Sequence, residues 1–225
     1  MRTLSSVMFL LLVALSASAA PLTNSGSLSV GYREKDITFG NISSRQGAVY
    51  TNVDLRLQSF HFAVNAANNM SLKETSMYQT DVLVGYKLFS SLADVEFGGT
   101  QVFKGKPVVT DMAQHFRPFV ALSKGFVTLT GKMDLEAKTT NVQLDLNQST
   151  SLIGDLTGKL SGFVGYTDVN DARPRSLKEI KYTNAYYGGA LDFSWKVLGA
   201  GVYVLRSGHT NDTTFGWRTQ LTLKF

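Results

Sequence analysis

The last eleven residues of the chain, Phe215 to Phe225, alternate between two kinds of side chain and end on an aromatic residue. In an extended strand, successive side chains point to opposite faces, so a period of two separates the two kinds. One face carries Phe215, Trp217, Thr219, Leu221, Leu223 and Phe225, and the other carries Gly216, Arg218, Gln220, Thr222 and Lys224. The pattern excludes a helix here, and it suits a wall that separates lipid from water.

The first nineteen residues predict a targeting segment. Arg2 supplies a positive charge, Val7 to Leu15 is an apolar stretch, and Ala17-Ser18-Ala19 offers the small residues of a cleavage site. The apolar stretch is shorter than the roughly 20 residues of a membrane-spanning helix. We therefore interpret residues 1–19 as a cleaved signal peptide and residues 20–225 as one domain, since no Pro-rich linker or charge block divides them.

Composition narrows the function classes. The chain has no cysteine, which excludes disulfide bonds, thiolate metal sites and lipid attachment to a cysteine. The formal net charge is +5, or +4 once Arg2 is removed, and the basic residues form no clustered face. Nucleic-acid binding is therefore not expected. No other segment reaches the roughly 18 apolar residues of a membrane helix.

Period-two alternation recurs along the whole chain. It predicts an all-β fold with twelve strands, or ten if two of the shorter segments fail. The segments are 27–33, 49–58, 60–65, 78–88, 93–100, 115–122, 127–136, 141–146, 155–166, 184–195, 198–204 and 215–225. Pro118 lies inside one of them and lacks a backbone N–H, so we expect a bulge or a strand end there.

The connections between these segments alternate in length. Long connections span 34–46, 67–77, 103–114, 168–180 and 207–213, while short ones lie near 59, 90–91, 123–125, 148–151 and 196. The connection at 137–138 is the one short member on the long side. Short turns on one side and longer loops on the other, with an even strand count, are typical of a single closed antiparallel transmembrane β-barrel.

Aromatic residues gather near the predicted strand ends, where they suit the two bilayer interfaces. The expected belt on the short-turn side is Phe60, Phe62, Phe126, Trp195 and Phe225. The expected belt on the long-loop side is Tyr50, Tyr78, Phe116, Tyr166 and Trp217.

The opposite faces of the strands carry charge of both signs, which predicts a polar lumen. The predicted pore-lining residues are Arg33, Asp54, Arg56, Asp81, Lys87, Asp94, Glu96, Arg117, Lys132, Asp134, Asp145, Lys159, Asp192 and Arg218, with Glu136, Asp155 and Lys224 on the same rows. Buried charges need partners or water. Two readings stay open: a salt-bridge network that plugs the barrel, and a wet channel. The mixed signs argue against a strongly selective ring of one charge.

Candidate catalytic and metal-binding residues are few. Three histidines are present: His61, His115 near Asp111, and His209 beside Ser207 and Asp212. The last group contains the residue types of a hydrolase triad, so a rim active site is an alternative. Asp94 with Glu96, and Asp134 with Glu136, are the acidic pairs considered for acid–base or cation chemistry. No two histidines share a chelating spacing. The sequence predicts no enzyme, no cofactor and no metal site.

The signal segment, the amphipathic strands, the alternating loops and the terminal Phe225 together resemble the outer-membrane β-barrel class of Gram-negative bacteria. Gly31-Tyr32-Arg33 and Val84-Gly85-Tyr86 resemble small proteobacterial barrel proteins of unassigned function. The resemblance implies an outer-membrane location after export through the periplasm, with Trp217, Leu221, Leu223 and Phe225 as the barrel-assembly signal.

The expected function is a porin-like passive channel, and a structural or adhesion barrel is the alternative. Expected partners are small polar solutes, outer-membrane lipid, lipopolysaccharide and the barrel-assembly machinery. A basic group around the loop at 168–180, Arg173, Arg175, Lys178 and Lys181, is the candidate contact for lipopolysaccharide.

Overall fold

A computed structural model describes residues 24–34, 36–38, 41–44, 47–69, 78–105, 113–171 and 180–225. Twelve antiparallel strands form one closed barrel, as the alternation predicts. The strands are β1 (Ser25–Arg33), β4 (Ala48–Leu57), β5 (Phe60–Asn69), β6 (Tyr78–Leu88), β7 (Asp94–Gly105), β8 (Ala113–Lys124), β9 (Val127–Asp134), β10 (Thr139–Ile153), β11 (Leu156–Asp171), β12 (Ile180–Trp195), β13 (Leu198–Ser207) and β14 (Thr213–Lys224). The proposed signal segment lies outside the described residues.

Each strand pairs with its neighbours in the chain, and the first and last strands close the ring. At this seam β1 pairs with β14 from Ser27↔Lys224 to Arg33↔Arg218. The backbones of Gly26 and Phe225 also bond to each other, at 2.7 and 3.0 Å. Closure pairs the backbone groups that an open sheet would leave at its edges, which the hydrocarbon of a bilayer would require.

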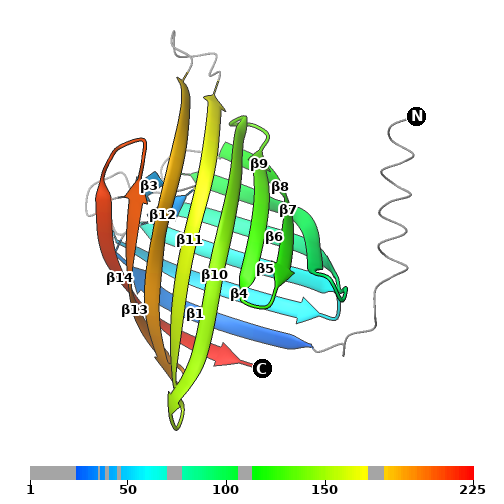
Figure 1. Cartoon of the computed structure of the whole chain (residues 1–225), viewed down its shortest axis with the longest axis vertical. Helices are drawn as coiled ribbons and strands as arrows, with labels where there is room; N and C mark the ends of the chain where they lie inside the picture. The colour runs from blue at the N-terminus through cyan, green and yellow to red at the C-terminus, as the bar shows by residue number, and fades with distance from the viewer. Residues whose placement is uncertain are drawn as a thin grey trace.

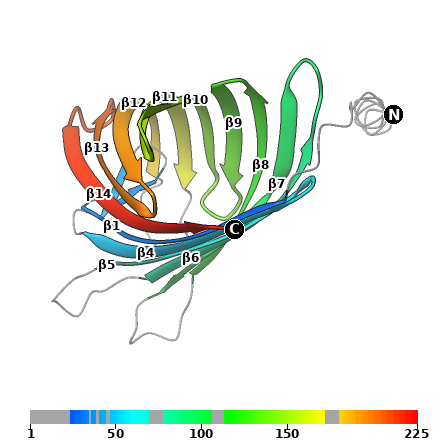
Figure 2. The same cartoon turned by 90° about the horizontal axis from the view of Figure 1, so that it is seen from below.

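The barrel wall is flattened and its two sides cross. Strands β10 to β13 run steeply along one side, and β4 to β7 cross behind them at a shallower slope (Figure 1). Seen from below, β10 to β12 lie opposite β1, β4 and β5 around the ring (Figure 2). The two sides of the wall enclose an interior cavity, which residues of β1 and β4 to β6 line together with residues of β9 and β10.

The outward faces of the strands are apolar and exposed. Val84 in the middle of β6 and Leu221 in the last third of β14 are 55% and 53% exposed. Trp217, Leu223 and Phe225 are exposed on the same face as Leu221. Side chains that are buried, such as Val102, Phe119 and Leu205, come from the inward rows. Contiguous apolar surface of this extent marks contact with lipid or with another protein.

Short turns gather at one end of the barrel and longer connections at the other. Between consecutive strands, the short turns are 58–59, 89–93, 125–126, 154–155 and 196–197. Strand β10 runs on to Ile153, so the turn predicted at 148–151 was wrong by a few residues. The polar residues Asn147 to Ser151 are exposed on both faces of the strand. Because neither face is buried there, polar side chains are accommodated without ending the strand. Gly154, with φ of +55°, makes the actual turn, and Asp155 lies in it rather than on the lumen wall.

One predicted connection contains strands of its own, and one further sequence prediction was wrong. Part of the connection at 34–46 forms a hairpin of β2 (Asp36–Thr38) and β3 (Asn41–Ser44). No bulge occurs at Pro118, because β8 pairs with β7 without a register shift. The ladder between β8 and β9 begins only at Phe119↔Lys132, so the missing N–H of Pro118 falls just beyond it.

The aromatic residues expected at the strand ends are mostly exposed on the outer face. Phe60, Phe62, Phe126, Trp195 and Phe225 are exposed on the short-turn side, as are Phe116, Tyr166 and Trp217 toward the longer connections. Tyr50 is the exception, because its hydroxyl donates a hydrogen bond to Gln220 Oε1 inside the barrel at 3.1 Å. It sits on the inward row of β4, so its assignment to the outer belt was wrong. The side chain of Tyr78 lies outside the described residues.

Candidate functional site

The barrel encloses a polar cavity of about 650 Å³. Strands on both sides of the seam and on the opposite wall line it. Its lining residues include four basic side chains, Arg33, Arg117, Lys132 and Arg218, and two acidic ones, Asp54 and Asp81. A smaller cavity of about 290 Å³ adjoins it and contains Lys159 and Asp192 together with Arg218 and Gln220.

Glycines opposite aromatic residues let the rings lie against the wall. A Cβ atom on Gly165 would overlap the Tyr186 ring, and the same holds for Gly216 and Tyr203. Directly paired inward residues show this arrangement at Gly31↔Tyr50, Gly165↔Tyr186, Phe163↔Gly188 and Tyr203↔Gly216. Rings that cover a neighbouring glycine lie along the sheet rather than across the interior. The cavity therefore remains although several large residues point inward.

Near the short turns, His61 lies between two carboxylates. Its Nδ1 lies 2.6 Å from Glu96 Oε1, and its Nε2 lies 3.1 Å from Asp54 Oδ2. Arg56 Nε donates to Asp54 Oδ1 at 3.3 Å. Lys87 and Asp94 form a separate pair at 3.0 Å. Six interior charged or titratable groups thus pair across β4 to β7.

On the opposite side of the cavity, Arg218 and Asp192 form a two-point ion pair. Arg218 Nε and Nη2 lie 2.8 and 2.5 Å from the two Asp192 oxygens. The pair reaches across β13 over Gly201, where a Cβ atom would overlap the Asp192 carboxylate. The Arg33 guanidinium lies 5.5 Å from the centre of the Tyr50 ring, a cation–π distance.

A partly buried hydrogen-bond network joins β10, β11 and β12 and ends at the Asp145 carboxylate. Asn141 Nδ2 donates to Thr167 Oγ1 at 2.8 Å and to the Tyr186 hydroxyl at 2.7 Å. The Tyr186 hydroxyl donates to Gln143 Oε1 at 2.7 Å, and Gln143 Nε2 donates to Asp145 Oδ1 at 2.7 Å. Tyr186 is 1% exposed. This wall is rigidified by hydrogen bonds in place of an apolar core.

Toward the longer connections, Asp134 is the most enclosed carboxylate of the described residues, at 1% exposure. It accepts hydrogen bonds from Arg117 Nε at 2.8 Å, from His115 Nδ1 at 3.1 Å and from the Ala137 N–H at 2.9 Å. Glu136 lies past the end of β9, and its carboxylate accepts the Phe116 N–H at 2.7 Å. These contacts tie the outer ends of β8 and β9 together.

Lys132 is one of the basic residues that line the main cavity. Asp81, Asp145 and Arg117 are close enough to act on its charge. Asp81 also accepts two hydrogen bonds from Gln79, at 2.9 and 3.0 Å. Lys132 is therefore the basic group best placed to act on a solute in the main cavity.

The structure brings most of the predicted lumen residues into contact with one another. The fourteen predicted positions comprise seven acidic and seven basic residues. Arg56 and Asp54 pair within β4, and the other three ion pairs join strands that are neighbours or next neighbours in the ring. Sequence reasoning missed His61, Tyr50, Asn141, Gln143 and Tyr186 as interior groups. Their positions on the inward rows of the alternation were the available signal. That any of these residues lines a conducting pore stays a prediction.

The candidate hydrolase residues are not assembled as a triad. The Ser207 hydroxyl donates to Asn184 Oδ1 at 3.0 Å. The His209 ring stacks on Tyr182 at 4.0 Å between centroids. Asp212 contributes a backbone carbonyl to the Ser207 N–H at 3.1 Å. Asp111, Arg173, Arg175, Lys178 and the Lys181 side chain lie outside the described residues.

No helix with the length and apolarity of a membrane span occurs in the part of the chain that the structure describes.

Comparisons with known proteins give no family. No family model matches the chain, and no curated protein matches it. Among solved structures, a membrane protein from work on in-meso crystallisation matches with a TM-score of 0.48 and 12% identity, over 89% of this chain and 84% of that one. OccK1 (OpdK) of Pseudomonas aeruginosa matches with a TM-score of 0.35 and 9% identity, over 92% of this chain and 67% of that one. OccK2 (OpdF) of the same organism, solved with glucuronate, matches with a TM-score of 0.28 and 12% identity, over 82% of this chain and 64% of that one. The fold assignment rests on the closed sheet of this chain itself.

Proposed function

We propose that the protein is an outer-membrane β-barrel that works as a porin-like passive channel for small polar solutes. One observation carries the proposal: the barrel is apolar on the outside and encloses a polar cavity of about 650 Å³. Lipid would cover the exposed rows that contain Val84 and Leu221, and water would fill the interior. The charged groups need no desolvation in such an interior, since water and neighbouring charges satisfy them.

The proposal includes partners and no catalysis. Outer-membrane lipid and lipopolysaccharide would surround the outer face. The barrel-assembly machinery would recognise the C-terminal segment that contains Trp217, Leu221, Leu223 and Phe225 after export. Small polar solutes would pass by way of the cavity and contact Lys132, Arg33 and Asp81. No residue of the interior is assigned a chemical step.

A plugged structural barrel is the second candidate. The bonded groups around His61, Asp134 and Asp192 favour it, because paired side chains from several strands occupy interior space. Twelve strands fall between the filled barrels of eight and the open channels of about sixteen. Planar-bilayer recording of the refolded protein decides between the two. A channel gives discrete conductance steps, and a plugged barrel inserts without them.

The lumen charge at Lys132 should set ion preference. For the Lys132→Glu variant we expect the reversal potential in a salt gradient to shift toward cation selectivity. Two unit charges about 8 Å apart interact by about 0.5–2 kcal/mol at a dielectric constant of about 80 to 20. Reversing one charge therefore changes the cation-to-anion permeability ratio by about twofold or more.

The matched control is Lys124→Glu, which makes the same change at the end of β8 on the short-turn rim. Its shift should be smaller, since salt screens a charge at an open rim. Equal shifts for the two variants would show that Lys132 does not face the conducting path.

A further inference from the structure

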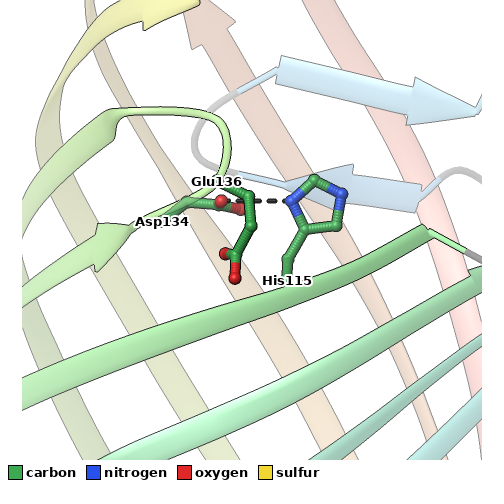
Figure 3. Close-up of side chains that lie close together, drawn as sticks. All are labelled: His115, Asp134 and Glu136. Carbon is green, nitrogen blue, oxygen red and sulfur yellow. Dashed lines mark hydrogen bonds and ion pairs between the residues drawn. The ribbon is translucent and has the colours of Figure 1, made fainter.

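Three potential metal ligands converge at the outer ends of β8 and β9. His115 projects from β8, Asp134 is the last residue of β9, and Glu136 lies in the turn that follows. Ligand atoms of the three side chains all lie within 4.8 Å of one another. Figure 3 shows the Asp134 carboxylate in contact with the His115 imidazole, with the Glu136 side chain close beside the pair.

Side chains join the outer ends of β8 and β9, where the regular backbone pairing between the two strands has ended. Pro118 has no N–H to donate, and the regular ladder between β8 and β9 ends beside it at Phe119↔Lys132. Beyond that point the Leu135 N–H donates to the Phe116 carbonyl at 3.1 Å. The Glu136 carboxylate accepts a hydrogen bond from the Phe116 N–H, and the Asp134 carboxylate accepts hydrogen bonds from Arg117 and His115.

The spacing within the group suits coordination. Zinc bonds to histidine nitrogen and carboxylate oxygen are about 2.0–2.2 Å long, so two ligands of one ion lie about 3 Å apart. His115 Nδ1 and Asp134 Oδ1 are separated by 3.1 Å. A metal ion would replace the proton that these two atoms share. Glu136 Oε2 holds the Phe116 N–H, which leaves the second oxygen of that carboxylate for the ion.

Neighbouring groups hold the ligands in place. Arg117 Nε occupies Asp134 Oδ2, and the Ala137 N–H bonds to Oδ1, so the carboxylate is oriented to bind through a single oxygen. Such supporting bonds to metal ligands orient them and tune the site. The two carboxylates supply anionic oxygen ligands, and Arg117 offsets one of their two negative charges.

The other interior histidine lacks this arrangement. Glu96 and Asp54 contact different ring nitrogens of His61, Nδ1 and Nε2. The two nitrogens of one imidazole point in different directions, so a single ion cannot bind His61 and both acids. The two histidines therefore differ in metal-binding capacity although each contacts carboxylates.

We propose that His115, Asp134 and Glu136 bind a divalent transition-metal ion of the zinc type, which clamps β8 to β9 at the long-connection rim. The sequence predicted no metal site, because spacing along the chain does not show that β8 and the turn after β9 meet. Imidazole with carboxylates is a donor set that zinc accepts. The clamp is independent of whether the barrel conducts.

Isothermal titration of zinc chloride into the refolded, untagged protein in detergent tests the proposal. We expect one ion per chain. His115→Asn keeps a side-chain donor near Asp134 but removes the ring nitrogen, and Glu136→Gln alters an exposed side chain. Each should weaken zinc binding by about tenfold or more, since altering even supporting groups of metal sites costs about 10–100-fold.

His61→Asn and His209→Asn are the matched controls and should bind zinc as the unmodified protein does. Glu136→Gln also keeps the test valid if His115→Asn refolds poorly, because the glutamine amide oxygen can still accept the Phe116 N–H. The proposal is overturned if the unmodified protein binds no zinc at millimolar concentration, or if both His115→Asn and Glu136→Gln bind it with unchanged affinity.

Discussion

Replacing Val84 with arginine should lower the free energy of unfolding in lipid vesicles by about 2–4 kcal/mol, the cost of a basic residue at the bilayer midplane on the lipid face of a barrel. Val84 lies in the middle of β6 and is 55% exposed on the outer face. Its surroundings in the proposed setting are hydrocarbon, which cannot hydrate a guanidinium. Urea-driven unfolding followed by tryptophan fluorescence measures the change.

The adjacent residue provides the control. Leu83 lines the main cavity on the inward face of the same strand. Leu83→Arg adds the same charge to a wet interior that holds Asp81 two residues away, so the loss should be below about 1 kcal/mol. Equal losses at the two positions would contradict the assignment of lipid to one face and water to the other.

Removing the Asp134 carboxylate should be the most destabilising single change inside the barrel. Asp134→Ala removes the acceptor of Arg117, His115 and the Ala137 N–H from a site that is 1% exposed. Removing one partner of a buried ion pair costs about 3–5 kcal/mol, because the remaining charge loses its compensation. The same unfolding measurement gives the value.

Asp94→Ala is the comparison for an accessible pair. Asp94 bonds to Lys87 with 31% and 23% of the two side chains exposed. Such a pair contributes about 0–1 kcal/mol. If the Asp134 and Asp94 variants lose similar stability, the enclosed network at the outer ends of β8 and β9 does not hold the barrel as described.

The number of strands and the two faces of each strand could be predicted from the sequence, because successive side chains of a strand point to opposite faces. The row through Phe215, Trp217, Leu221 and Phe225 points outward in the structure, as that alternation predicts. The antiparallel order followed from the short connections, which join only neighbouring strands. Closure required the first and last strands to pair, and the even strand count anticipated it.

Sequence predictions were wrong at positions where the residue type suggested one structure and the alternating pattern suggested another. The polar run Asn147 to Ser151 resembled a turn, although β10 continues through it. Tyr50 was placed in a belt because it is aromatic and near a strand end, but the parity of β4 turns it inward. Pro118 suggested a bulge, and the end of the β8–β9 ladder accommodates it without one. In each case the position within the sheet outweighed the residue type.

The pairing of interior groups was beyond the sequence. His61 and Glu96 are 35 residues apart and on strands separated by β6. Arg218 reaches Asp192 across β13 because Gly201 has no side chain in between. Such partners depend on register and on glycine positions in an intervening strand. The inward row names the residues of a lumen, and only the structure shows which of them meet.

Labelling of single cysteines along β14 tests the two-faced wall most directly. The chain contains no cysteine, so each introduced thiol is the only one. In lipid vesicles, a charged water-soluble thiol reagent should modify Gln220→Cys, which faces the cavity, and spare Leu221→Cys, which is 53% exposed on the outer face. Equal labelling of the two variants, or preferential labelling of Leu221→Cys, would contradict an oily exterior around a wet interior.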